Sequence, residues 1–355
     1  MDFSDQIIKW YLKNKRQLPW RETTDPFKIW LSEIILQQTR VDQGLSYYYN
    51  FITAFPTIQK LAEAPEIKIL KLWQGLGYYS RARNMHFTAK QIVKDNNGIF
   101  PSDYNELLKL KGIGKYTAAA IASFSFNKPY AVIDGNVTRV ISRFFGITDP
   151  VDNPKTSGKI ERIANELLNK KKPGTYNQAI MEMGAIVCKP QNPCCNICVL
   201  NYACLAFEKK LTGKIPLKLK KTIVKKRFLN YIIINTVRNN RKFVFIRKRS
   251  GKGIWKNLYD FPCIESNSSL TPDELFKSEN WKSIFQNSRI VVSHISQEII
   301  HKLSHQELHA RFYEISSKSP LLKIPDDYIE IQPNSLSEFP IPRLIDRYLK
   351  SARSS

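Results

Sequence analysis

Four cysteines close together just past the middle of the chain constrain its fold more than any other feature. They follow the spacing C-x6-C-x2-C-x5-C and are Cys188, Cys195, Cys198 and Cys204. One compact loop can therefore gather four thiolates around a single centre. Four thiolates suit either a zinc ion or an iron-sulfur cluster, and the spacing alone leaves both open. Because a disulfide framework would spread its cysteines along the chain, we predict a metal centre in a reducing compartment.

Two further cysteines lie outside this spacing. Cys194 is adjacent to a predicted ligand, and we interpret it as a spectator thiol. Cys263 lies far along the chain and is most simply a small buried hydrophobic residue.

The charge balance indicates a polyanionic partner. The chain has 55 Lys and Arg against 31 Asp and Glu, a formal net charge of +24. No stretch approaches the roughly 18 apolar residues of a spanning helix, so nucleic acid is favoured over a membrane. The first residues, MDFSDQIIKWYLKNKRQLPW, lack the apolar core of a signal peptide. We expect a cytoplasmic, nucleoid-associated protein that binds DNA and no membrane.

The 355 residues are enough for two domains. Apolar residues recur at helical spacing over residues 1–208, which predicts an all-α domain. From residue 228 to 350 the chain has short β-branched and aromatic runs, and FLNYIIINTV and KFVFIRKR, separated by RNNR, predict a hairpin in an α+β domain. Residues 209–227 contain nine Lys or Arg and no acid. This basic linker is either a solvated connector or a segment that lies along phosphates.

A glycine-containing turn lies within residues 108–122, LKLKGIGKYTAAAIA. The pattern predicts two helices joined by a turn that contains Gly112 and Gly114. Glycine allows positive φ and lets backbone N–H groups approach a phosphate. The pattern alone also fits an ordinary connection between two helices.

Several of these segments resemble the endonuclease III and MutY glycosylases of the helix-hairpin-helix superfamily. The cysteine spacing after NQAIMEMGAIVC resembles their [4Fe-4S] loop (188–204), LKGIGKYTAA resembles their helix-hairpin-helix, and SEIILQQTRV resembles the MutY segment with the catalytic glutamate. The resemblance is strongest over residues 19–204. It implies an all-α glycosylase core with a [4Fe-4S] cluster. It also implies a monomeric enzyme that hydrolyses the bond to adenine mispaired with 8-oxoguanine or guanine in double-stranded DNA.

Excision of a base needs two carboxyl groups with different roles. The sugar passes through an oxocarbenium-like state, which calls for a carboxylate near it and an acid that protonates the leaving base. The resemblance assigns the acid to Glu33 and the carboxylate to Asp134. Taken without the resemblance, an Asp before Gly-Asn is a common turn residue, and a helical glutamate commonly faces solvent.

The surroundings of Glu33 predict a raised pKa. Asp25-Pro26 is a favourable helix start, and the predicted helix FKIWLSEIILQQT places Glu33 within one turn of Trp30 and Ile34. A carboxyl group among apolar side chains has a raised pKa, as an acid that acts near neutral pH requires.

The chain lacks the lysine of the bifunctional relatives. In those enzymes a lysine two residues after the second glycine forms a Schiff base with the sugar, and here that position is Tyr116. Lys115 comes one residue earlier and would face another direction on the helix. We therefore predict a monofunctional glycosylase.

The resemblance also implies the residues that support the acids and bind DNA. Tyr116 and Asn136 would support the two carboxyl groups by hydrogen bonds. An adenine must leave the stack to be excised. The residues matched to substrate and DNA contacts are Trp20, Arg21, Gln38, Thr39, Leu76, Tyr78, Gly112, Gly114, Gln178, Ser304 and His305.

Five of these residues have specific roles by resemblance. Gln178 would contact the extruded adenine edge, and Trp20 and Arg21 would line the same pocket. Gln38 and Tyr78 would fill the gap left in the stack. A core position for Tyr78 is the alternative.

The second domain resembles the Nudix-like domain of MutY. GIWKNLYDFP is close to the G-L-W-E-F-P stretch, but CIESNSSLTPDELF lacks the glutamates with which a Nudix hydrolase binds magnesium. We therefore expect a reader of the lesion. Leu303, Ser304 and His305 match the F-S-H loop that touches 8-oxoguanine, with a leucine in place of the aromatic residue. His305 also fits a surface histidine.

Two other functions compete with this one. The first is a related mismatch glycosylase that excises another base such as thymine, against which Glu33 and the reader domain speak. The second is a non-catalytic iron-sulfur protein that binds DNA.

Overall fold

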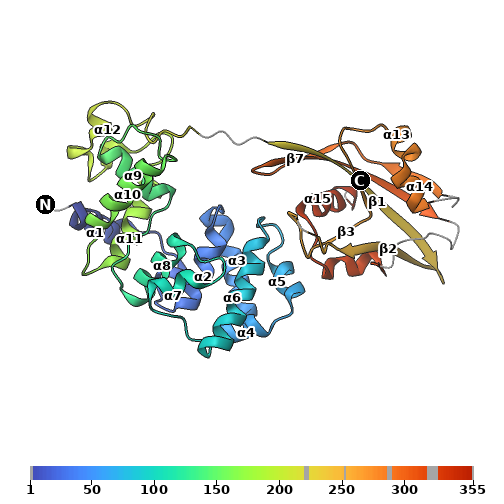
Figure 1. Cartoon of the computed structure of the whole chain (residues 1–355), viewed down its shortest axis with the longest axis horizontal. Coiled ribbons are helices and arrows are strands. Elements are labelled where there is room, and N and C mark those ends of the chain that lie inside the picture. Colours follow the sequence, from blue (N-terminus) through green and yellow to red (C-terminus); the bar gives the residue numbers. More distant parts are fainter. Residues whose placement is uncertain (1–2, 220–223, 252, 286–289, 318–326, 354–355) are drawn as a thin grey trace. The chain divides into compact units, whose positions relative to one another are not determined.

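The computed structural model describes residues 3–219, 224–251, 253–285, 290–317 and 327–353 (Figure 1). It forms two compact units, of which the first comprises residues 1–64 and 84–220 and the second residues 65–83 and 221–355. Residues 220–223 of the predicted linker lie outside the described residues. No helix within the described ranges is long and apolar enough to cross a membrane.

The first unit is helical, as the sequence predicts. Its α-helices are α1 (Phe3–Asn14), α2 (Pro26–Leu36), α3 (Val41–Ala54), α4 (Ile58–Glu63), α6 (Ser80–Asn96, of which 80–83 group with the second unit), α7 (Tyr104–Lys109), α8 (Lys115–Phe126), α9 (Gly135–Phe144), α10 (Pro154–Glu166), α11 (Pro173–Glu182) and α12 (Leu205–Glu208). The shorter helical turns are η1 (Pro19–Arg21), the π-helical η2 (Met183–Val187), η3 (Cys195–Ile197) and η4 (Asn201–Ala203).

Helix α2 begins where the sequence predicts. The side chain of Asp25 accepts a 2.9 Å hydrogen bond from the backbone N–H of Phe27, and Pro26 occupies the first helical position. The helix ends at Leu36, earlier than predicted, because the backbone of Gln38 turns to a φ of +56°.

Helices α2 and α8 pack against each other. Four alanines of α8, Ala118, Ala119, Ala120 and Ala122, are at most 3% exposed, so this helix is buried on several sides. This packing places residues of α2 opposite the start of α8.

Only the first glycine of the turn between α7 and α8 uses the conformational freedom that glycine allows. Gly112 has a φ of +82°. Gly114 has a φ of −95° and is the N-cap of α8. Gly112 and Gly114 are both exposed.

The second unit contains a mixed sheet with the strand order β3-β2-β1-β7-β5, in which β4 also pairs with β1, β6 with β7 and β8 with β2. The central pair β1 and β7 is parallel, whereas the other pairs are antiparallel. The strands are β1 (Lys225–Arg238), β2 (Arg241–Lys248), β3 (Tyr259–Asp260), β4 (Cys263–Ser266), β5 (Ile290–Ile295), β6 (Ile299–Lys302), β7 (Gln306–Ser317) and β8 (Tyr328–Ile331). The helices are α5 (Glu66–Leu72), α13 (Pro272–Lys277), α14 (Glu279–Phe285), η5 (Pro333–Glu338) and α15 (Arg343–Arg353).

Helices cover both faces of the central strand pair. Trp281 of α14 packs with Ile232 and Tyr313 on one face. On the other face, the ring of Tyr348 from α15 stacks on Phe312 at 3.9 Å between ring centroids. The middle of β1 is therefore buried on both sides, which explains its continuous apolar run.

The predicted hairpin is confirmed. Strands β1 and β2 pair antiparallel, with Arg238 opposite Arg241. Asn239 and Asn240 have φ values of +46° and +61°, as a two-residue turn with left-handed residues requires.

The two ends of the predicted linker are structured. Strand β1 already begins at Lys225. At the other end Ile215 is buried, and its carbonyl accepts a 2.9 Å hydrogen bond from Nε of Arg143. The N–H of Val151 donates to the carbonyl of Leu217 at 3.0 Å. The segment up to residue 219 thus packs against the first unit, despite its linker-like composition.

Candidate active site

A cavity of about 190 Å³ in the first unit gathers most of the predicted catalytic residues. It is lined by side chains from η1, α2, α8, α9 and α11 and the segments next to them. The predicted residues in its lining are Trp20, Arg21, Glu33, Thr39, Tyr116, Asp134, Asn136 and Gln178.

Glu33 lies in an environment that favours its protonated form. Its side chain comes from the buried face of α2, and the residue is 6% exposed. The hydroxyl of Tyr116 donates a 2.6 Å hydrogen bond to Oε2 of Glu33. Burial raises the pKa of Glu33 to about 7, although the hydrogen bond from Tyr116 opposes the rise. The predicted increase in this pKa is confirmed.

Asp134 is held rigidly as the N-cap of α9. Its Oδ1 accepts a 2.7 Å hydrogen bond from the backbone N–H of Val137, and its Oδ2 accepts one of the same length from Nδ2 of Asn136. Burial raises the pKa of Asp134, and these hydrogen bonds counteract the rise. The expected support of Glu33 by Tyr116 and of Asp134 by Asn136 is therefore present.

Arg139 orients the Asn136 amide, a role that our sequence reasoning missed. Its Nη2 donates to Oδ1 of Asn136 at 2.7 Å, which directs the amide NH2 group toward Asp134. The same nitrogen donates to the carbonyl of Gly184 at 2.8 Å, and Nε donates to the carbonyl of Cys188 at 2.7 Å. Gly184 lies so close that a Cβ added there would be 2.6 Å from Cβ of Asn136.

Glu182 is a second buried carboxyl group in the cavity that the sequence analysis missed. It is fully buried, and Arg16 and Arg21 each donate two side-chain hydrogen bonds of 2.7–3.0 Å to it. Burial opposes its ionisation, but the hydrogen bonds from Arg16 and Arg21 outweigh this and lower the pKa of Glu182 to about 2. Glu182 is thus a fixed anion, whereas Glu33 can carry a proton. Only long-range packing reveals this pairing, because the partners lie 166 and 161 residues apart.

Gln178 and Gln38 occupy different environments. Oε1 of Gln178 accepts a 2.6 Å hydrogen bond from the hydroxyl of Tyr11, which fixes its amide in the cavity wall. Gln38 is exposed in the turn after α2 and does not line the cavity.

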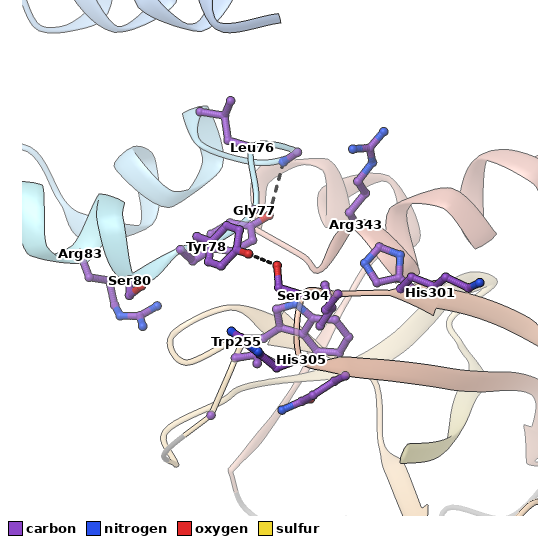
Figure 2. Close-up of a pocket in the computed structure, with 17 residues that line it drawn as sticks. Leu76, Gly77, Tyr78, Ser80, Arg83, Trp255, His301, Ser304, His305 and Arg343 are labelled. Atoms are coloured by element: carbon purple, nitrogen blue, oxygen red, sulfur yellow. Dashed lines mark hydrogen bonds between the residues drawn. The ribbon is translucent and has the colours of Figure 1, made fainter. Parts of the chain in front are cut away.

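A second pocket, of about 410 Å³, lies within the second unit and contains four more of the predicted contact residues (Figure 2). Leu76, Tyr78, Ser304 and His305 all line it, together with Trp255. Figure 2 shows the hydroxyl groups of Tyr78 and Ser304 pointing toward each other, and they form a hydrogen bond.

Tyr78 projects from a tight loop. Its φ is +46°, and the residue is 43% exposed. The alternative of a core tyrosine was therefore wrong. The guanidinium of Arg81 lies 5.8 Å from the centre of the Tyr78 ring and donates to the carbonyls of Leu76 and Gly77 at 3.2 and 3.3 Å. Arg81 therefore supports the loop that presents Tyr78.

The four predicted cysteine ligands line one small apolar cavity of about 30 Å³. Nη1 of Arg143 lies 3.4 Å from Sγ of Cys188 and donates to the carbonyl of Lys189 at 2.7 Å. Across the described ranges, no three His, Cys, Asp or Glu side chains are grouped to hold a single metal ion. Four thiolates around a common space next to a guanidinium are a suitable donor set for a larger, negatively charged cluster.

Comparisons with known proteins give consistent matches for both units. Residues 31–170 match the family described as HhH-GPD superfamily base excision DNA repair protein, and residues 234–351 match the NUDIX domain. The chain is 37% identical over 308 residues to the adenine DNA glycosylase of Buchnera aphidicola subsp. Schizaphis graminum. The aligned region covers 86% of this chain and 85% of the relative.

Solved structures resemble the helical part. A thermostable thymine-DNA glycosylase aligns with a TM-score of 0.54 and 29% identity over 58% of this chain and 95% of its own. An endonuclease III in a non-covalent DNA complex aligns with a TM-score of 0.51 and 22% identity over 59% of this chain and 94% of its own, which shows a shared fold.

Proposed function

Because the chain belongs to the adenine DNA glycosylase family, with a helix-hairpin-helix core and a Nudix-like second domain, we propose that its substrate is adenine opposite 8-oxoguanine or guanine in duplex DNA. It is a monofunctional base-excision-repair glycosylase that acts on N-glycosyl bonds. The observation that carries the proposed mechanism is the pair formed by Glu33, whose pKa is about 7, and Asp134, whose carboxylate is fixed by hydrogen bonds.

Glu33 is the acid in this mechanism. With a pKa of about 7, roughly half of the molecules carry the proton at neutral pH, and the carboxyl group can give it to a ring nitrogen of the adenine. Protonation makes the base a better leaving group. Tyr116 holds Oε2, so the carboxyl group keeps one orientation while the substrate enters.

Asp134 stabilises the positive charge that develops on the sugar. Its orientation is fixed by Val137 and Asn136 before the reaction begins, so little reorganisation is needed as the charge appears. It acts either through its charge or by forming a transient bond to the sugar carbon.

No lysine is among the described residues that line the cavity, so no amine nucleophile is in place there. Tyr116 lines the cavity at the position where bifunctional relatives have lysine. Lys115 is absent from the cavity lining, and its Nζ lies 3.3 Å from Oε1 of Glu161. Water is therefore the group that finally bonds to the sugar carbon released from the base, and no Schiff base forms.

Gln178 supports recognition of the extruded adenine. Because Tyr11 donates to Oε1, the amide nitrogen of Gln178 remains to donate to an acceptor on the purine edge. Trp20 and Arg21 line the same cavity, and Arg21 is fixed by Glu182. A pocket with fixed polar groups discriminates strongly against bases that leave those groups unpaired.

The pocket of the second unit is the proposed reader of the opposite base. Tyr78 is exposed and can enter the stack, and Ser304 and His305 present polar groups beside it. Gln38, exposed after α2, would help to fill the gap left by the adenine. Leu303 offers apolar contact instead of aromatic stacking.

Cys188, Cys195, Cys198 and Cys204 would hold a [4Fe-4S] cluster. When bound, this cluster would tie the loop into one rigid piece and take no part in hydrolysis, which moves no electrons. Arg143 contacts Cys188 and would offset part of the negative charge of the thiolates.

The test is a set of duplexes that differ in one base pair. We expect a break after alkali treatment at adenine opposite 8-oxoguanine or guanine, and none at an A:T pair or at thymine opposite guanine. Borohydride should trap no covalent DNA adduct. Cleavage at thymine would support the rival glycosylase, and binding without cleavage of any duplex would support the non-catalytic protein. We expect a monomer in solution that acts at the nucleoid.

A further inference from the structure

One face of helix α6 contacts the turn between α7 and α8. Asn84, Phe87 and Thr88 stand at positions i, i+3 and i+4, so they share this face. Each of them touches Lys111 or Gly112, the two exposed residues at the tip of the turn.

The hydroxyl of Thr88 fixes a peptide plane of the turn. Thr88 is fully buried, and its Oγ1 donates a 2.7 Å hydrogen bond to the carbonyl of Lys111. In a planar trans peptide the C=O and the following N–H point in opposite directions. Because the Lys111 carbonyl points toward α6, the N–H of Gly112 points away from it.

Asn84 of α6 also contacts this peptide, at Gly112. Gly112 has a φ of +82°, and a Cβ added there would lie 2.9 Å from Cβ of Asn84. The backbone of the turn therefore rests directly on the helix, and a larger residue would displace it.

Phe87 restrains the charged side chain of the turn. Its side chain is 52% exposed, and Nζ of Lys111 lies 4.5 Å from the centre of the ring. An ammonium group over an aromatic face is attracted to it. The Lys111 ammonium is thus held at the side of the turn that faces α6.

We propose that Thr88 is a positioning residue for DNA binding, which aims the Gly112 N–H at a phosphate, while Phe87 restrains the Lys111 ammonium at the same turn. This inference rests on the proposed function, because it requires the turn to hold DNA. Thr88 touches no DNA itself and acts through the Lys111–Gly112 peptide.

Substitutions at Thr88 separate its hydroxyl from its volume. Thr88→Val keeps the shape, Thr88→Ala shortens the side chain, and Thr88→Ser keeps the hydroxyl. The probe is a duplex with a non-cleavable adenine analogue opposite 8-oxoguanine. We expect Kd to rise about tenfold for Thr88→Val and Thr88→Ala and to stay within about twofold of the wild type for Thr88→Ser. The excision rate at saturating DNA should change less than about twofold in all three.

Phe87→Leu tests the second half of the proposal at an exposed position where folding is not at risk. We expect Kd to rise about threefold. The proposal is overturned if the Thr88 variants bind as tightly as the wild type, if Thr88→Ser loses as much as Thr88→Val, or if the saturated rate falls while Kd is unchanged. Failure of both hydroxyl-free variants to fold would also overturn it. Failure of the proposed function appears separately, as a wild-type protein that excises no adenine.

Discussion

The hydroxyl of Tyr116 donates a 2.6 Å hydrogen bond to Oε2 of Glu33. The two residues come from α8 and α2, which pack against each other. The hydrogen bond stabilises the charged form of Glu33, whereas burial stabilises the neutral form and has the larger effect. Tyr116 thereby limits how far the pKa of Glu33 rises.

The excision rate should fall as pH rises above neutrality. Glu33 acts as an acid, and its pKa is raised from 4.5 to about 7, so the active protonated fraction is nearly full well below pH 7, falls to half near pH 7, and approaches a decrease of about tenfold per pH unit above it. Single-turnover rates between about pH 5.5 and about pH 9 check this. A rate that increases through pH 7 would show that Glu33 is not the acid.

Tyr116→Phe should move this decline to higher pH. Removing the hydroxyl removes a group that stabilises ionised Glu33, so the pKa of Glu33 increases. The maximal rate should also fall, because the carboxyl group loses its fixed orientation. The same pH series measures both effects, and an unchanged midpoint would contradict the assigned hydrogen bond.

Glu33→Gln should abolish excision and retain DNA binding. Loss of a general acid costs about 100-fold to 10,000-fold in rate. Because the folded-state pKa is raised, Glu33 favours folding at low pH and this contribution is lost as pH rises through 7. Glutamine does not ionise, so its gain in melting temperature over the wild type should be larger at pH 8 than at pH 5. Normal cleavage by this variant would refute the assignment.

Asp134→Asn separates catalysis from folding. Asparagine caps a helix about as well as aspartate, but its NH2 group would face the Nδ2 of Asn136, so the melting temperature should fall modestly while the protein still folds. The negative charge is lost, and the rate at saturating DNA should fall at least about 100-fold. Thermal unfolding and single-turnover kinetics on one preparation give both numbers. A stable variant with wild-type rate would remove Asp134 from the mechanism.

Cys198→Ser and Cys194→Ser form a matched pair for the cluster. Both residues line the small cavity, but only Cys198 belongs to the four-cysteine spacing. Cys194→Ser should keep iron, labile sulfide and the visible absorbance near the wild-type level, and Cys198→Ser should lose most of them. If the wild-type protein contained zinc and no iron, the four cysteines would form a zinc site, and the proposed cluster would be refuted.

Local signals in the sequence predicted those parts of the fold that depend on neighbouring residues. Asp25-Pro26 starts α2 through a cap two residues away, and the turn at Asn239 and Asn240 depends on the backbone conformation of these two residues. Most catalytic and contact residues taken from the resemblance meet in two pockets, eight in the cavity with Glu33 and four in the pocket with Tyr78, whereas Gln38, Gly112 and Gly114 line neither.

The parts that the sequence did not reveal depend on distant contacts. The hydrogen bonds from Arg16 and Arg21 to Glu182, and those from Arg139 to the carbonyls of Gly184 and Cys188, join segments that no local pattern relates. Residues 65–83 have helical spacing like their neighbours, yet they group with the sheet unit. Composition cannot reveal which core a short helix joins.

The close approach of Gly184 to Asn136 has a consequence for interpreting inherited variation in this chain. Residue 184 would touch neither the adenine nor the sugar, yet any side chain there would push against the start of α9 and displace the carboxylate at its tip. A strain that carried such a change should therefore lose excision as one without Asp134 does, although the protein could still be abundant in the cell.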